Sequence, residues 1–145
     1  MNKNKRGFTL IELLVVIAII GLLSTLAVVA LGSARQKAND SKRLSDIKQI
    51  QTALELYYTD NNAYPAGTAI DLGSTDYACL NSATGFTTAA CPSPYMGLVP
   101  KGPGSSEYYS YTMASSTYTI TATLEVGAGG FTVGAITASP SGLTQ

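Results

Sequence analysis

An unbroken apolar run near the start of the chain constrains its fold most strongly. Residues 8–31 contain one ionisable side chain, that of Glu12. As a helix rising about 1.5 Å per residue, this run would extend roughly 36 Å, which is enough to cross the hydrocarbon core of a bilayer. The sequence therefore predicts a single membrane-spanning helix.

A basic segment comes directly before the apolar run. Lys3, Lys5 and Arg6 lie there without an acidic neighbour. Because basic flanks stay on the cytoplasmic side of a membrane, we expect a cytoplasmic N-terminus and place the residues after the span outside the cytoplasm.

Two other interpretations of the apolar run stay open. A secretory signal peptide would be cut near Ala30-Leu31-Gly32, but its apolar region usually has about 7 to 15 uncharged residues. An uncut anchor for a monomeric surface domain also fits, because hydropathy alone does not separate an anchor from an assembly helix. The residue types around Gly7 and Glu12 weigh against a plain anchor.

The junction of the basic and apolar segments reads Arg6-Gly7-Phe8-Thr9-Leu10-Ile11-Glu12. This motif resembles the class III signal sequence of type IV pilins and type II secretion pseudopilins, and the resemblance is strongest over residues 5–65. It implies a pilin-like fold, cleavage after Gly7 by a prepilin peptidase and N-methylation of the new terminus at Phe8. It also implies an assembly ATPase, a polytopic membrane platform and other pilins as partners.

Elementary chemistry gives the same positions a rationale. Gly7 has no side chain, so the backbone there can enter a protease cleft in an extended form. Cleavage would leave a positive amine at Phe8, one helical turn before Glu12. In a staggered bundle, Glu12 of one copy would pair with that amine in the next copy and fix the register, as the family resemblance also implies. The simpler alternative is that Glu12 only complements the helix dipole.

The helical pattern continues beyond the span. Residues 33–58 contain no proline or glycine, and apolar side chains recur there mostly at helical spacing: Ala34, Ala38, Leu44, Ile47, Leu54 and Tyr58. We expect one helix from residue 8 to about residue 58, ended by turn residues and Pro65. Its charged side chains are expected on the faces away from the apolar stripe: Arg35, Lys37, Lys42, Arg43, Lys48, Asp40, Asp46 and Glu55.

Cys79 and Cys91 lie in the part placed outside the cytoplasm. An oxidising compartment favours a disulfide between them, with free thiols as the alternative. The chain has no histidine, so a zinc site would lack ligands, and a histidine-based hydrolase triad is excluded. No phosphate-binding loop or paired carboxylate motif is present, and a formal charge of zero gives no indication of nucleic-acid binding. We therefore expect no catalytic residue, metal or cofactor.

The last third of the chain alternates apolar and polar residues. Three expected strands follow from this alternation: Tyr109, Tyr111 and Met113; Tyr118, Ile120, Ala122, Leu124 and Val126; Phe131, Val133 and Ala135. An antiparallel meander of these strands would cover the outer half of the helix, with most of the tyrosines in the core.

The sequence thus predicts an α+β protein in which a long N-terminal helix packs against a small antiparallel sheet. Its expected segments are a leader at residues 1–7, a transmembrane and assembly half-helix at 8–31, an amphipathic half-helix at 32–60, a connecting loop with the disulfide at 61–104, and the sheet with a C-terminal tail at 105–145. The predicted function is that of a structural subunit of a type IV pilus-like filament, serving adhesion, motility or DNA uptake. A secretion pseudopilin, a minor tip subunit that binds a ligand and a monomeric anchored domain are the alternatives. The expected location is the cytoplasmic membrane and then an extracellular or periplasmic filament.

Overall fold

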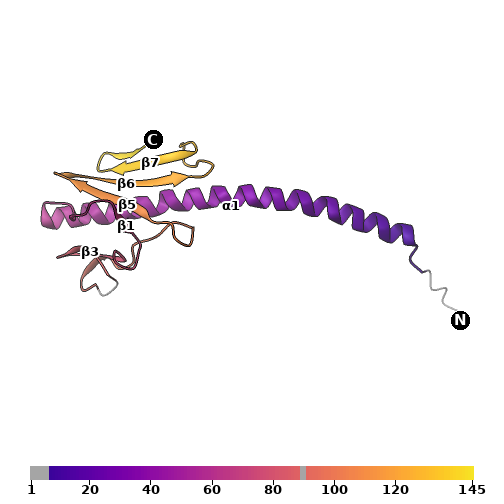
Figure 1. The fold of residues 1–145 in the computed structure, drawn as a ribbon, viewed down its shortest axis with the longest axis horizontal. Coiled ribbons are helices and arrows are strands. Elements are labelled where there is room, and N and C mark those ends of the chain that lie inside the picture. The colour runs from indigo at the N-terminus through magenta and orange to yellow at the C-terminus, as the bar shows by residue number, and fades with distance from the viewer. Residues whose placement is uncertain (1–6, 89–90) are drawn as a thin grey trace. The chain divides into compact units, whose positions relative to one another are not determined.

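The computed structural model describes residues 7–88 and 91–145, which divide into two compact units. The first unit ends at Arg35, and the second is Gln36–Gln145. Helix α1 (Leu10–Asn61) contributes to both units, and the strands described below belong to the second (Figure 1). The predicted α+β class, with one long N-terminal helix and antiparallel sheet, is confirmed. Most of the expected leader, residues 1–6, lies outside the described residues.

Helix α1 ends in a left-handed cap at Asn62. The backbone φ of Asn62 is 53°, and its N–H donates to the carbonyl oxygen of Tyr58 at 2.8 Å. Asparagine adopts this conformation more readily than most residues, and the bond satisfies one carbonyl of the last helical turn. Pro65 follows shortly afterwards and cannot continue a helix.

The larger sheet has five antiparallel strands in the order β1-β5-β6-β7-β8. Their bounds are β1 (Ile70–Leu72), β5 (Tyr109–Ala114), β6 (Thr117–Leu124), β7 (Gly134–Ser139) and β8 (Gly142–Thr144). The expected meander is present as β5, β6 and β7, but its third strand was placed too early. Phe131 and Val133 precede β7, because the backbone after β6 leaves the sheet to bind α1 through Asp40.

A second, smaller sheet lies within the expected connecting loop. Strands β2 (Cys79–Asn81), β3 (Gly85–Thr87) and β4 (Pro94–Met96) pair antiparallel in the order β3-β2-β4. Each has three residues, which is too short for an alternation of apolar and polar residues to be recognised in the sequence.

The core of the second unit lies between α1 and the larger sheet, and Figure 1 shows β5, β6 and β7 beside the magenta part of the helix. Tyr109, Tyr111 and Tyr118 are fully buried, as expected for core tyrosines. The predicted helix stripe was wrong at both ends, since Ala34, Ala38 and Tyr58 are exposed, while the adjacent Tyr57 is buried.

The largest correction concerns charged residues of α1. Asp40, Arg43 and Asp46 were expected on solvated faces, yet they are only 0%, 4% and 6% exposed. Burial of an ion is stable only where partners surround it, and the sheet supplies those partners.

Candidate assembly site

A capping box begins helix α1. The Thr9 N–H and Thr9 Oγ1 both donate to Glu12 Oε2, at 2.8 and 2.6 Å. The Glu12 N–H donates to Thr9 Oγ1 in return, at 3.3 Å. This reciprocal arrangement satisfies N–H groups that have no partner inside the helix. Thr9 is a residue that sequence reasoning missed, although the spacing Thr-x-x-Glu was its signal.

The Glu12 carboxylate keeps one oxygen available. Both Thr9 donors use Oε2, and no described residue donates a hydrogen bond to Oε1. Glu12 lies in a shallow hollow of about 420 Å³ whose other lining residues are apolar: Phe8, Ile11, Val15 and Val16. Oε1 of this carboxylate can therefore accept a hydrogen bond from a donor on a second molecule, beside an apolar surface.

Gly7 and Phe8 lie before the first helical residue, Leu10. Both are exposed, and Phe8 retains 84% of its accessible surface. No described atom lies within 4 Å of the position that a Cβ of Gly7 would occupy. The peptide bond joining the two residues is thus outside the helix and open to an enzyme.

The apolar part of α1 buries nothing against the described residues. Its large side chains all remain exposed, and its most apolar window, with a mean hydropathy of 2.9, is 0% buried. By length and composition this helix can cross a membrane. The apolar helix fits a membrane-anchored protein.

The second unit holds a buried ionic group that we call the Arg43 cluster, which comprises Arg43, Asp40, Glu107 and Glu125. Arg43 Nη1 lies 2.6 Å from Asp40 Oδ1. Its Nε and Nη2 contact both oxygens of Glu107 at 2.5 and 2.9 Å, and Nη2 also lies 2.6 Å from Glu125 Oε1. The hydrogen bonds that Arg43 donates, to Glu107 first and then to Glu125 and Asp40, raise its pKa despite its burial.

Asp40 also fixes the chain where it leaves β6. Its carboxylate accepts the backbone N–H groups of Glu125, Val126 and Gly127 at 2.8 to 2.9 Å. Burial by itself would raise the pKa of Asp40, but these three bonds and Arg43 outweigh it and hold the pKa below its usual range. The buried negative charge of Asp40 is therefore compensated by the Arg43 guanidinium and by three backbone N–H groups.

Asp46 makes a second polar link between α1 and the sheet. It accepts a 2.8 Å hydrogen bond from the Tyr109 hydroxyl and pairs with Lys42 at 2.6 Å. Burial first, and the bond to Asp46 second, raise the pKa of Tyr109. Lys42 Nζ donates in addition to the carbonyl of Lys101 at 2.7 Å. Apart from the Arg43–Asp40 and Lys42–Asp46 pairs within α1, the partners of the buried helix charges thus come from residues more than 50 positions later in the chain.

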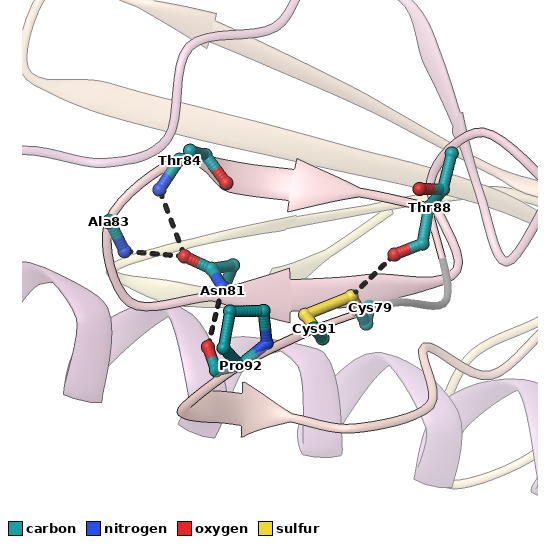
Figure 2. The surroundings of a disulfide bond; sticks show 7 residues. All are labelled: Cys79, Asn81, Ala83, Thr84, Thr88, Cys91 and Pro92. Carbon is teal, nitrogen blue, oxygen red and sulfur yellow. Dashed lines mark hydrogen bonds between the residues drawn. A yellow bond between two sulfur atoms is a disulfide. The ribbon is translucent and has the colours of Figure 1, made fainter.

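The predicted disulfide between Cys79 and Cys91 is confirmed (Figure 2). Beside it, the Asn81 side chain donates to the carbonyl of Pro92 at 2.6 Å and accepts the N–H groups of Ala83 and Thr84. These bonds hold β2 to the segments that lead into β3 and β4. Within residues 7–88 and 91–145, no group of three or more His, Cys, Asp or Glu residues is arranged to hold a metal ion.

Comparison with known proteins agrees with the geometry at the start of α1. Residues 2–32 match the family described as the prokaryotic N-terminal methylation motif. The chain is 47% identical over 63 residues to the type II secretion system core protein G of Pectobacterium carotovorum subsp. carotovorum. The matched residues make up 43% of this chain and 40% of that protein. It is 48% identical over 62 residues to the protein of the same name from Escherichia coli K12, covering 43% of each.

A pilus protein is also similar. The chain is 42% identical over 73 residues to the type IV wide pilus major component PilA4 of Thermus thermophilus, covering 49% of this chain and 56% of that protein. The chain therefore spans less than half of the two secretion proteins and about half of the pilus protein. No solved structure matches the chain significantly. The predicted resemblance to type IV pilins and pseudopilins is confirmed.

Proposed function

We propose that this chain is a structural subunit of a type IV pilus-like filament, processed at Gly7 and polymerised through its N-terminal helix. The observation that carries the proposal is an exposed apolar helix with one carboxylate, Glu12, near its start. Such a surface is stable only in lipid or against other apolar helices. The methylation motif at residues 2–32 and the similarity to PilA4 support it.

Assembly follows from exchanging one apolar environment for another. A subunit leaves the bilayer when helices of neighbouring copies cover its residues 8–31. Cleavage after Gly7 gives Phe8 a positive amine, and this amine in one copy meets the free Oε1 of Glu12 in the next. The ion pair is excluded from water inside the bundle, so it fixes the axial stagger between copies.

The proposal includes an orientation and a set of partners. The basic residues Lys3, Lys5 and Arg6 keep the N-terminus cytoplasmic before assembly. A prepilin peptidase cuts and methylates the chain, and an assembly ATPase acting through a polytopic platform extracts it together with other pilins. The second unit then faces outward in the extracellular or periplasmic filament.

A secretion pseudopilus is the second candidate function. Its support is the identity of 47 to 48% to two proteins named type II secretion system core protein G. The same processing and helix packing would serve either filament, so only its cellular role differs.

The processing step is tested by expressing the full chain with its own assembly genes and determining the N-terminus of the filament protein by mass spectrometry. We expect N-methylated Phe8 in the native chain, whereas Gly7→Leu should keep Met1 and form no filament. Gly21→Ala is the matched control, because no described atom beyond the adjoining helix backbone lies within 4 Å of its new Cβ, and it should be cut normally. Native filaments that retain Met1, or an absence of filaments, would overturn the proposal.

The cellular role is tested by deleting the gene for this chain. Loss of surface pili with normal protein export would assign it to a pilus. Loss of export with normal pili would assign it to a secretion pseudopilus.

A further inference from the structure

A groove of about 510 Å³ runs along α1 and is lined by both polar and apolar residues. On the helix it is lined by Ser41, Leu44, Ser45, Lys48, Gln49 and Thr52, of which Lys48 is the charged one, and Gly129 lines it from the loop after β6. We call this surface the basic groove.

The hydroxyl groups of the basic groove have partners within α1. Ser41 Oγ donates to the carbonyl of Lys37, and Thr52 Oγ1 donates to that of Lys48, both at 2.9 Å. Ser45 Oγ accepts a bond from Gln49 at 3.3 Å. Since the hydroxyl groups of Ser41 and Thr52 keep their acceptors when water leaves, covering these two groups costs little. The ion pairs of the described residues include neither Lys37 nor Lys48.

A second groove, of about 620 Å³, lies over the outer face of β5, β6 and β7. Ser110, Thr121 and Thr123 lie along it, and three members of the Arg43 cluster also line it: Arg43, Glu107 and Glu125. We call this surface the acidic groove.

The acidic groove carries excess negative charge. Of the ionisable residues that line it, Arg43 carries one positive charge and Glu107 and Glu125 carry two negative charges, which leaves one negative charge in excess. The Glu125 side chain is 40% exposed, and its Oε2 receives no hydrogen bond from the described residues. A cation brought to this rim would find an open acceptor.

We propose that the basic groove of one copy docks onto the acidic groove of the next, with Lys48 facing Glu125; this contact rests on the proposed filament function. The two grooves share no lining residue, so one copy offers both at once. A contact between two different surfaces of the same chain repeats without closing and builds an open helix. Its opposite charges select the register of the second units while the apolar helices pack.

Cross-linking tests the contact without altering the fold. Filaments of the full chain, assembled from a mixture of ¹⁴N- and ¹⁵N-labelled copies, are treated with a zero-length carbodiimide that joins amines to carboxylates. We expect mixed-isotope peptides that join Lys48 or Lys37 to Glu125 or Glu107, and none from the detergent-solubilised monomer. Filaments whose cross-links between copies avoid these residues overturn the contact.

Charge reversal gives an independent test. Lys48→Glu should lower filament yield about tenfold by placing like charges opposite each other, whereas Lys48→Arg, which keeps the positive charge, should assemble as the native chain does. Lys101→Glu is the matched control, because Lys101 is exposed, has no ion pair with any residue that the structure describes and lies outside both grooves, and it should assemble normally. A Lys48→Glu variant that forms as much filament as the native chain would overturn the docking contact but not the proposed filament function. Failure of the native chain to form filaments overturns the proposed function as well.

Discussion

Thr9 Oγ1 lies 2.6 Å from Glu12 Oε2, so the one carboxylate of the apolar run is held by its own chain before any partner reaches it. The bond lowers the cost of carrying a carboxylate at the edge of a membrane, since Oε2 is already satisfied. The bond also orients the Glu12 carboxylate, because it holds Oε2 toward Thr9 and leaves Oε1 free to accept a hydrogen bond from another molecule. Glu12 therefore has two separable roles, a helix cap and a charge that pairs with another copy.

Substitutions of Glu12 separate these roles. Glu12→Gln keeps a side chain that completes the capping box but removes the charge, whereas Glu12→Ala removes both. We expect both variants to be cleaved after Gly7 and to assemble badly, which would be measured as sheared filament protein relative to membrane protein.

Thr9→Ala provides the complementary control. It removes the cap, worth about 1 kcal/mol of helix stability, and leaves the charge of Glu12 in place, so it should assemble better than Glu12→Gln. Native filament yield from cells that carry only Glu12→Gln would show that the charge has no part in assembly.

The parts of the fold that depend on local sequence were predictable. The apolar run required a long helix, the alternation around Tyr118 and Ile120 required strands, and the cysteine pair in an oxidising compartment required a disulfide. Each of these signals is contained in a short window of residues. The start of α1 could also have been predicted from the Thr-x-x-Glu spacing. The apolar run begins at Phe8, however, so the helix was expected from residue 8, whereas it begins at Leu10, after the Thr9 cap.

The buried charges were not predictable from such windows. On α1 alone, Asp40 and Arg43 look like an ordinary solvated pair at helical spacing. Their burial depends on Glu107 and on the backbone after β6, which are more than 60 residues away. Only the tertiary fold brings these groups together.

Removing the guanidinium of the Arg43 cluster should destabilise the second unit strongly. Arg43→Met keeps much of the side chain's apolar length but leaves Asp40 buried without its cation, which typically costs about 3 to 5 kcal/mol. Lys48→Met, an exposed cation on the same helix, should change stability by no more than about 0.5 kcal/mol. Urea unfolding of the full chain in detergent, followed by circular dichroism, measures both. Equal midpoints for the two variants would contradict a structural role for the cluster.

The disulfide should contribute several kcal/mol to the second unit. It joins residues 12 positions apart, and closing a loop of that size is worth roughly 3 kcal/mol through the entropy of the unfolded chain. The double variant Cys79→Ala and Cys91→Ala should lose this stability in urea unfolding, and reductant should then have no further effect on it. An unchanged midpoint when the native chain is reduced would contradict the prediction.

Acid should destabilise the protein by protonating carboxylates of the Arg43 cluster. Asp40 and Glu107 have lowered pKa values, Asp40 because hydrogen bonds outweigh its burial and Glu107 chiefly because of Arg43. Lowered carboxyl pKa values add stability that is present above the unfolded values of about 3.9 and 4.3 and is lost as the pH falls through the folded ones. Unfolding free energy should therefore be nearly constant from pH 7 to about pH 5 and fall steeply below about pH 4. Glu107→Gln should flatten that fall, and a stability that rises between pH 5 and pH 3 would contradict it.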